Sequence, residues 1–374
     1  MLVFFILTIM EDNKIRVGIT QGDINGVGFE VILKTFAEPM MTEMCTPVVY
    51  GSPKVAAYHR KSLDLSTNFS IINSAADAES GRLNVVNCTA DDVKVEFGKP
   101  EAESGKAALD SLEKAIEDYR EGLIDVIVTA PINKHTIQSD DFSFPGHTEY
   151  MQQRLGEGKD ALMILLNGDL RVALVTGHIP VSRIAERLTK ELIQKKMRIF
   201  NEALKNDFGI SRPRIAVLAL NPHAGDDGLL GEEEQQVIVP AMQEMAQKGV
   251  LCYGPFPADG FMGSGSFAHF DGVLAMYHDQ GLAPFKALAM DDGVNFTAGL
   301  PVVRTSPAHG TAYDIAGKGV ASEGSFRQAV FLAMDIYRHR LNEEAIHVNP
   351  LRKQYYEKRD DSDKLKLDSV DDDI

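Results

Sequence analysis

The chain has 374 residues, of which 44% are hydrophobic and 25% charged, a composition typical of a folded globular protein with room for two domains. Its formal net charge of -16 argues against a nucleic-acid partner, because binding a phosphate backbone needs clustered Lys and Arg. The cysteines at positions 45, 88 and 252 lack any C-x-x-C spacing, so a disulfide framework and a zinc ribbon are disfavoured and a reducing cytoplasm fits best.

The two ends of the chain differ from the rest. The first ten residues, MLVFFILTIM, are almost wholly apolar, but they lack the basic flank and the small-residue cleavage site of a signal peptide. They reach half of a membrane-spanning length, and no later segment approaches about 18 consecutive apolar residues. We therefore expect no membrane partner, and we interpret residues 1–10 and the acidic end, 358–374, as disordered or non-native extensions.

Between these ends, short apolar runs alternate with amphipathic stretches, which is typical of βα units and a largely parallel sheet. The runs are rich in Val, Ile and Leu without strict alternation, as expected for strands covered on both faces. Strands are predicted at 15–20, 124–129, 171–176, 214–220 and 272–277. Helices that place an apolar stripe on the sheet are predicted at 106–121, 187–206 and 325–341.

Polar or ionisable residues follow the predicted strands where ordinary turn residues would be expected. In an open parallel sheet, ligands bind outside the carboxyl ends of the strands, so these side chains should meet at one site. They are Asp23, Lys134, His135, His178, His223 and His278. A lone histidine is more often structural, but three in the same topological position favour a shared metal or substrate site.

The three histidines suit a metal ion in their chemistry. Three imidazoles form a facial set of ligands for Zn²⁺, Co²⁺ or Fe²⁺ and leave positions open for a substrate. An added carboxylate, with Asp259 or Asp279 as candidates, would make the site more tolerant of Mg²⁺ or Mn²⁺. Alternatively, the histidines hold an anionic substrate directly.

Two further segments carry groups suited to a phosphate. In FPGHTEY, residues 144–150, a Pro-Gly loop leads into a helix whose free N–H groups and Thr148 hydroxyl can receive a phosphate, although Thr148 could equally be an ordinary N-cap. The irregular run that ends at Arg304 also contains Lys286 and Asn295. Separate cations that reach into a pocket are what a phosphate and a carboxylate require.

A glycine-rich segment, HGTAYDIAGKGVA at 309–321, would let the backbone approach a ligand closely. It matches neither the dinucleotide fingerprint nor the phosphate loop of nucleoside triphosphatases. ESGKAA at 103–108 also fails as a phosphate loop, because no hydroxyl follows Lys106. A triphosphatase is therefore disfavoured.

Several separate segments together resemble the 4-hydroxythreonine-4-phosphate dehydrogenase family of vitamin B6 biosynthesis. They are GITQGDINGVGFE, VTAPINKH, FPGHTEY, ALVTGHIP, LNPHAG, GPFPADG, YHDQGLAPFK and GVNFTAGLPVVRTSPAHGTA. The resemblance implies an α/β fold with a two-domain α/β/α architecture similar to isocitrate and isopropylmalate dehydrogenases. The active site would lie in the interdomain cleft at a homodimer interface. Residues 11–140 with 305–350 would form the nucleotide-side domain, and 141–304 the domain with the metal ligands and dimer contacts.

The resemblance also implies roles for individual residues. The metal ligands would be His178, His223 and His278, which need not come from one subunit. The substrate contacts would be His147, Thr148, Lys286, Asn295 and Arg304. The nucleotide loop would include Gly310, Thr311 and Asp314. Lys286 and Asp259 are the candidate catalytic residues, with Asp259 a candidate for the base that takes the hydroxyl proton.

The implied reaction is oxidation of 4-(phosphooxy)-L-threonine, a small phosphorylated hydroxy acid, in pyridoxine 5'-phosphate biosynthesis. NAD or NADP would accept a hydride, and a divalent metal (Zn, Mg or Co) would lower the pKa of the substrate hydroxyl. The resulting β-keto acid would decarboxylate to 3-amino-2-oxopropyl phosphate. The alternatives are a paralogous dehydrogenase for threonate or erythronate 4-phosphate, a metal-dependent phosphatase or hydrolase, and a non-catalytic sensor.

The chain departs from the family pattern in two places. At 23–29 it reads DINGVGF where the family more often has Asp-Pro-Ala-Gly-Ile-Gly-Pro, and after His223 it reads AGDDGLLGEEE, shifted from a commoner glycine-rich form. Neither change touches a predicted ligand, so both bear more on the exact substrate than on the reaction type.

Overall fold

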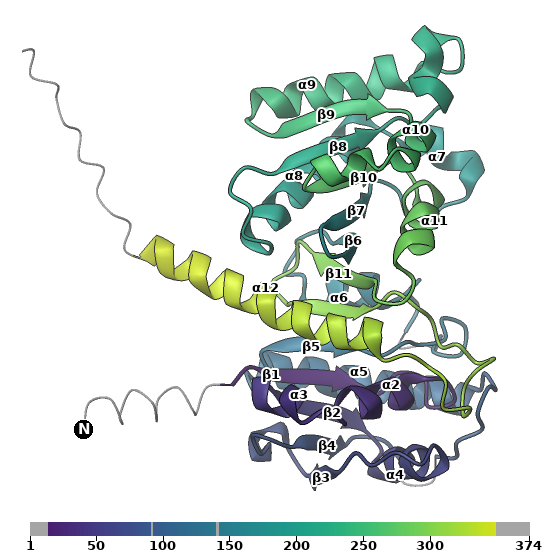
Figure 1. The fold of residues 1–374 in the computed structure, drawn as a ribbon, viewed down its shortest axis with the longest axis vertical. Helices are drawn as coiled ribbons and strands as arrows, with labels where there is room; N and C mark the ends of the chain where they lie inside the picture. The colour runs from purple at the N-terminus through teal and green to yellow at the C-terminus, as the bar shows by residue number, and fades with distance from the viewer. Residues whose placement is uncertain (1–13, 91–92, 140–141, 349–374) are drawn as a thin grey trace, which may run out of the picture.

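The computed structural model describes residues 14–90, 93–139 and 142–348, so the extensions expected at 1–10 and 358–374 lie outside the described residues. Within the described residues a twelve-stranded sheet carries helices on both faces, which confirms the α/β class (Figure 1). None of the described helices combines the length and the apolar composition needed to cross a membrane.

All the predicted strands are present in the sheet, but three end two residues early because their last apolar residues already belong to the loops that carry the site. In spatial order the strands are β3 (Phe69–Ile72), β4 (Leu83–Asn87), β2 (Thr46–Gly51), β1 (Arg16–Thr20), β5 (Val126–Thr129), β12 (Arg304–Pro307), β11 (Val294–Ala298), β6 (Leu162–Asn167), β7 (Leu170–Leu174), β10 (Gly272–Ala275), β8 (Arg214–Leu218) and β9 (Leu251–Phe256).

The sheet contains two blocks of parallel strands that run in opposite directions. In the first block β1 pairs with β2 and β5, and β5 with β12; in the second, β10 pairs with β7 and β8. Antiparallel ladders between β12, β11, β6 and β7 join the blocks. The expectation that all the strand ends share one edge is therefore wrong. Since neighbouring strands twist by roughly 20°, the axes turn by roughly 80° between β5 and β7, so the two sets of ends do not point directly apart.

Helices cover one face of the sheet continuously and the other face in two separate groups. On the continuous face, α2 (Gly28–Thr35), α12 (Gly324–Val348), α8 (Lys190–Asn206) and α9 (Val239–Gln247) enclose one core that runs under both blocks. On the other face, α5 (Ala102–Arg120) and α6 (His147–Leu155) pack on the first block, and α10 (Ala258–Gly263) and α11 (His278–Ala289) on the second. The space between these two smaller cores is where the candidate active site lies.

The remaining described α-helices are short: α3 (Pro39–Met44), α4 (Pro53–Ser62) and α7 (Ile184–Arg187). The helices predicted at 106–121, 187–206 and 325–341 are confirmed as α5, α8 and α12. The run from 278 to 304, which was expected to be irregular, is instead helix α11 followed by strand β11 and the turn into β12. The division into domains 11–140 with 305–350 and 141–304 stays a proposal, since the sheet continues across it.

His59 of α4 is a buried imidazole that ties this helix to the loop after β1. Its Nε2 atom donates a hydrogen bond to the carbonyl oxygen of Ile24 at 2.8 Å, and the rings of Phe29 and Phe97 pack against it. Burial lowers the pKa of His59 to about 4.

We expect the protein to lose stability as the pH falls through the interval between about 6.5 and about 4. The unfolded chain binds a proton at His59 near the ordinary pKa, whereas the folded chain does so only near 4, so roughly 3 kcal/mol of folding free energy is lost across this window. His59→Gln keeps a donor for Ile24 and should remove this part of the pH dependence. Denaturant unfolding at neutral and at mildly acidic pH measures it, and an unchanged pH dependence in the variant would contradict the assignment.

Candidate active site

A cavity of about 200 Å³ lies between the two cores of the split face, over the middle strands of the sheet. It is smaller than the roughly 300–1,000 Å³ of sites for drug-sized ligands, so it suits a small molecule. The structure brings all the predicted substrate contacts into its wall, namely His147, Thr148, Lys286, Asn295 and Arg304. Lys134 and His178, from the loops after β5 and β7, also line it, whereas the exposed His135 does not.

Several buried polar atoms of residues in the wall of this cavity have no hydrogen-bond partner among the described residues. They are Nε2 of His147, Oε2 of Glu149, Oδ1 of Asn295 and Nε2 of His309. Buried polar atoms in folded proteins are nearly always paired, because an unpaired one costs about 1–3 kcal/mol. Their concentration here indicates a wall built to bind a polar ligand.

Arg304, at the start of β12, is a buried cation that forms no ion pair with the side chains of the described residues. Its side chain is 2% exposed, and the guanidinium donates to the hydroxyls of Thr129 at 3.1 Å and Thr297 at 3.3 Å. Within the ranges that the structure describes, it forms no ion pair with a carboxylate. Burial lowers the pKa of Arg304 to about 10, so it remains charged at neutral pH. An unpaired buried charge is costly, and an anionic ligand would compensate it.

The amino end of α6 lies at the same cavity. Gly146 occupies the N-cap position and offers no side-chain cap, so Thr148 is not an N-cap and the alternative raised for it is wrong. The first-turn N–H groups of a helix attract anions. Burial, together with the nearby positive charges of Arg304 and Lys134, holds the pKa of His147 well below its usual value. His147 is therefore neutral at pH 7 and can accept or donate a hydrogen bond.

His178 and His278 lie side by side, with ring centroids 5.9 Å apart. The Nδ1 atom of His178 is 3.2 Å from Oε1 of Glu149, and the Nδ1 atom of His278 is 2.7 Å from Oδ1 of Asp279. A carboxylate on one ring nitrogen orients the imidazole and leaves Nε2 for a metal, as in many metalloenzymes. Both rings line a second cavity, of about 230 Å³, together with Tyr277.

His223 lies on a strained turn in a neighbouring cavity of about 670 Å³, which it shares with Asp259 and Tyr277. His223, Ala224, Asp226 and Asp227 all have positive φ angles, between 45° and 55°. Side chains other than glycine rarely adopt this conformation, and such strain clusters at functional sites. The buried Glu234 holds the start of this turn in place. Its Oε1 atom accepts hydrogen bonds from the N–H groups of residues 220 and 221 at 2.8 and 2.7 Å.

The three histidines are therefore not gathered around one point. Among the residues the structure describes, no group of three or more His, Cys, Asp or Glu side chains is arranged to hold a metal ion. His178 and His278 form a pair, and Tyr277, which lines the cavities on both sides, connects that pair to the cavity of His223.

The glycine-rich segment 309–321 joins β12 to α12 and lies against the loop that follows β1. Gly310 lines the small cavity, and a side chain added there would meet no atom within 4 Å, so its backbone is open to a ligand. The Thr311 carbonyl accepts a hydrogen bond from the N–H of Val27 at 3.1 Å. The Tyr313 hydroxyl donates to Oδ2 of Asp23 at 2.6 Å, so Asp23 supports this loop from outside the cavity. Asp314, the other predicted nucleotide contact, is exposed.

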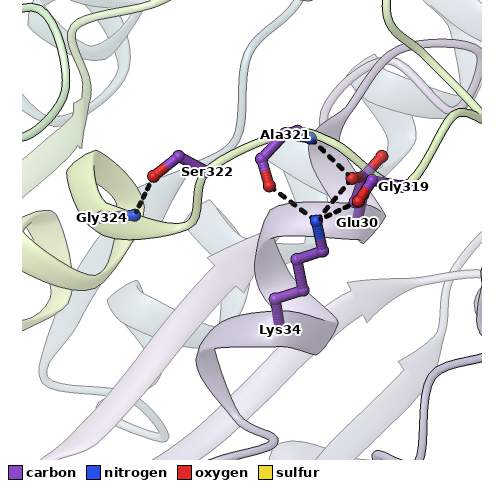
Figure 2. Close-up of polar contacts among 6 residues, drawn as sticks. All are labelled: Glu30, Lys34, Gly319, Ala321, Ser322 and Gly324. Carbon is purple, nitrogen blue, oxygen red and sulfur yellow. Dashed lines mark hydrogen bonds and ion pairs between the residues drawn. The ribbon is translucent and has the colours of Figure 1, made fainter.

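Helix α2 fastens the far end of this segment through an ion pair (Figure 2). Lys34 Nζ lies 2.8 Å from Oε1 of Glu30 and also donates to the carbonyl oxygens of Gly319 at 2.9 Å and Ala321 at 2.7 Å. Oε1 of Glu30 in turn accepts the N–H of Ala321 at 2.9 Å. Because Glu30 is only 1% exposed, this contact holds the loop in one position.

No role was predicted from the sequence for Glu149 or His309, although both lie in motifs that resemble the family, FPGHTEY and GVNFTAGLPVVRTSPAHGTA. Each lines the cavity and has a buried side-chain atom without a hydrogen-bond partner in the part of the chain that the structure describes. A motif shows which residues are adjacent, but it does not show which atoms remain without partners after folding. That signal exists only in the structure.

Comparison with known proteins gives a consistent result. A family model described as "Pyridoxal phosphate biosynthetic protein PdxA" matches residues 43–333. A 4-hydroxythreonine-4-phosphate dehydrogenase of Bacteroides thetaiotaomicron is 74% identical over 97% of this chain and 100% of its own. A putative D-threonate 4-phosphate dehydrogenase of Oceanobacillus iheyensis is 38% identical over 86% of this chain and 97% of its own. The crystal structure of a 4-hydroxythreonine-4-phosphate dehydrogenase from Klebsiella pneumoniae is similar with a TM-score of 0.76 and 35% identity, covering 87% of this chain and 98% of that one.

Proposed function

The chain belongs to the pyridoxal phosphate biosynthetic protein PdxA family, and on this basis we propose how the residues of its cavity bind and oxidise a small phosphorylated substrate. The protein is an oxidoreductase of the 4-hydroxythreonine-4-phosphate dehydrogenase type. Its substrate is 4-(phosphooxy)-L-threonine, which is oxidised to a β-keto acid that decarboxylates to 3-amino-2-oxopropyl phosphate.

The observation that carries the proposal is the buried, unpaired guanidinium of Arg304 in a wall of unsatisfied polar atoms. Arg304 and Lys286 neutralise the anionic groups of the substrate. His147 and Thr148, at the start of α6, bind phosphate oxygens. Asn295 hydrogen-bonds the substrate chain and so fixes which carbon faces the histidine pair.

The residues present fit a divalent metal (Zn, Mg or Co) in their chemistry. His178 and His278 already lie together with their Nδ1 atoms held by carboxylates, and His223 would complete the set from the same subunit or from a partner. A metal bound there would act as a Lewis acid on the substrate hydroxyl. Asp259, which shares a cavity with His223, is the proposed proton acceptor.

NAD or NADP is the proposed hydride acceptor, bound along the segment that includes Gly310, Thr311 and Asp314. The open backbone at Gly310 reaches the substrate cavity, which is where a nicotinamide ring must lie to receive a hydride. Thr311 keeps its carbonyl on the loop after β1 and so contributes by positioning the segment.

Lys34→Met should weaken nucleotide binding more than it slows turnover. Without the ammonium group, the carbonyls of Gly319 and Ala321 lose their donor and the buried Glu30 loses its partner. We expect KM for the nucleotide to rise roughly tenfold while kcat at saturation changes by less than about threefold. Steady-state kinetics measure both. The control is the double variant Glu30→Gln, Lys34→Met, which removes the stranded carboxylate. If the double variant regains both wild-type stability and the wild-type KM for the nucleotide, the loss of loop positioning is not what raised KM in Lys34→Met.

A homodimer with active sites shared between subunits, in the cytoplasm, completes the proposal. The homodimer explains why His223 can be separated from the histidine pair in one chain. Val181, which lines the cavity of the histidine pair, is an apolar side chain that is 75% exposed, and a second subunit would cover it. Sedimentation of the purified chain tests the subunit number.

The direct test is nicotinamide reduction with 4-(phosphooxy)-L-threonine, with and without a chelator and added divalent metal. We expect absorbance from the reduced nicotinamide only when substrate, nucleotide and metal are all present. Release of phosphate without that absorbance would favour a phosphatase instead. Turnover of threonate 4-phosphate in preference to the amino acid would favour the paralogous dehydrogenase. Thermal stabilisation by ligand without any turnover would favour a sensor.

A further inference from the structure

Glu149 is an acidic residue in a cavity whose other charged side chains include the cations Lys134, Lys286 and Arg304. It lies in the first turn of α6. Its two carboxylate oxygens differ: Oε1 lies 3.2 Å from Nδ1 of His178, whereas Oε2 is buried and has no partner. Orienting His178 uses only Oε1. The second oxygen is therefore available for a ligand.

The negative and positive charges of this wall act on one another electrostatically but form no ion pair in the described residues. In the described ranges of the chain, neither Lys134 nor Arg304 forms an ion pair with Glu149. Oε2 of Glu149 and the side chain of Arg304 are both buried, and the two residues line the same cavity. Two opposite charges that face one small space without meeting are complementary to a ligand that carries both signs.

The proposed substrate carries both signs, since it has an ammonium group as well as a carboxylate and a phosphate. A ligand with anionic groups alone would satisfy Arg304 and Lys286 but leave Oε2 of Glu149 buried beside it, where like charges repel. The corresponding hydroxy acid phosphates replace the ammonium group with a hydroxyl. The cavity therefore contains one feature that distinguishes these ligands by charge.

We infer that Oε2 of Glu149 binds the ammonium group of the substrate and thereby selects 4-(phosphooxy)-L-threonine over threonate 4-phosphate. This inference rests on the proposed function and makes Glu149 a specificity-determining residue. The same side chain also positions His178 through Oε1. The two roles predict different results for the two ligands, because the loss of His178 orientation affects both and the loss of ammonium recognition affects only one.

The test compares Glu149→Gln with the wild-type protein in binding and in turnover, using both phosphates. Glutamine keeps the shape of the side chain and an oxygen acceptor for His178 but removes the charge. Calorimetry without nucleotide gives the Kd of each ligand and needs no turnover, so it can be read even if the proposed reaction is absent. Glu186→Gln is the matched control, since Glu186 is an exposed helical carboxylate paired with Arg183 outside the cavity.

We expect Glu149→Gln to weaken binding of 4-(phosphooxy)-L-threonine roughly 30- to 300-fold while the Kd for threonate 4-phosphate stays within about threefold or falls. Glu186→Gln should behave as wild type with both. An equal loss of affinity for the two ligands, or no loss for either, would overturn the inference. If both proteins bind the amino acid phosphate with the expected difference but never reduce a nicotinamide, the proposed function fails and the assignment of Glu149 stands.

Discussion

Replacing Arg304 with methionine should strongly lower kcat/KM for the substrate and yet leave the ligand-free protein at least as stable as the wild type. The guanidinium is buried and donates to two hydroxyls, and it forms no ion pair with a carboxylate of the described residues, although Glu149 acts on it electrostatically. Replacing buried ionic groups with apolar side chains of similar volume is often neutral or stabilises the fold by about 1–4 kcal/mol. The substrate, however, loses a buried charge partner, which costs about 2–5 kcal/mol, or roughly 30- to several-thousand-fold in kcat/KM.

Arg340→Met is the matched control, because Arg340 is also a mostly buried arginine but has a counterion. Its Nε atom lies 2.6 Å from Oδ1 of Asp207, which is 3% exposed, so the substitution leaves a buried carboxylate without its partner, and neither residue lines the cavity. We expect this variant to melt at a lower temperature and to keep the wild-type KM. Thermal unfolding with and without phosphate, together with steady-state kinetics, separates the two variants. A fall in stability of Arg304→Met as large as that of Arg340→Met would show that Arg304 is structural.

Each of His178→Ala, His278→Ala and His223→Ala should abolish metal-dependent turnover while leaving the fold intact. Changing residues that merely orient metal ligands typically costs about 10- to 100-fold in metal affinity or activity, so losing a ligand should cost more. His178 and His223 are exposed and His278 is only partly buried, so their removal should hardly change the unfolding temperature. Metal content after dialysis and nicotinamide reduction at saturating substrate measure the effect.

His269→Ala is the control, because His269 is an exposed histidine with no place in any of the three cavities. It should keep both metal and activity. Retained turnover in any one of the three variants would remove that residue from the proposed ligand set. Loss of turnover with unchanged metal content would instead favour direct binding of the substrate by the histidines.

The long helices could be predicted because their apolar periodicity and their position between apolar runs agree. Helix α8 even begins at a recognisable signal, since the Thr189 side chain accepts a hydrogen bond from the N–H of Leu192 at 3.2 Å. The segment 278–304 was misread for identifiable reasons. Pro284 lies inside α11, and β11 turns directly into β12 through Gly299 and Leu300, so neither helical periodicity nor the βα pattern was visible.

The contents of the cavity could be predicted better than its geometry. His147, Thr148, Lys286, Asn295 and Arg304 were named from their motifs and chemistry, and the structure places them around one space. The strand-end rule assumes one parallel sheet, and the antiparallel ladders in the middle of this one reverse the second block. Which charges stay unpaired depends on those ladders and on side-chain packing, and neither can be read from the chain alone.

The ladder between β11 and β12 also has a mechanical consequence. Backbone hydrogen bonds join the two blocks of strands at this ladder, and α12 packs across it against β5, β12 and β11. The two halves of the molecule therefore cannot swing apart on a flexible linker, as in a hinged clamp. Asn295 and Arg304 belong to the ladder itself, so a motion of one block of strands relative to the other must flex the sheet and move these two residues with it. Because residues of the central ladder contact the ligand, ligand binding and the stiffness of the sheet are coupled. A ligand that fits the cavity should therefore make the whole sheet more rigid.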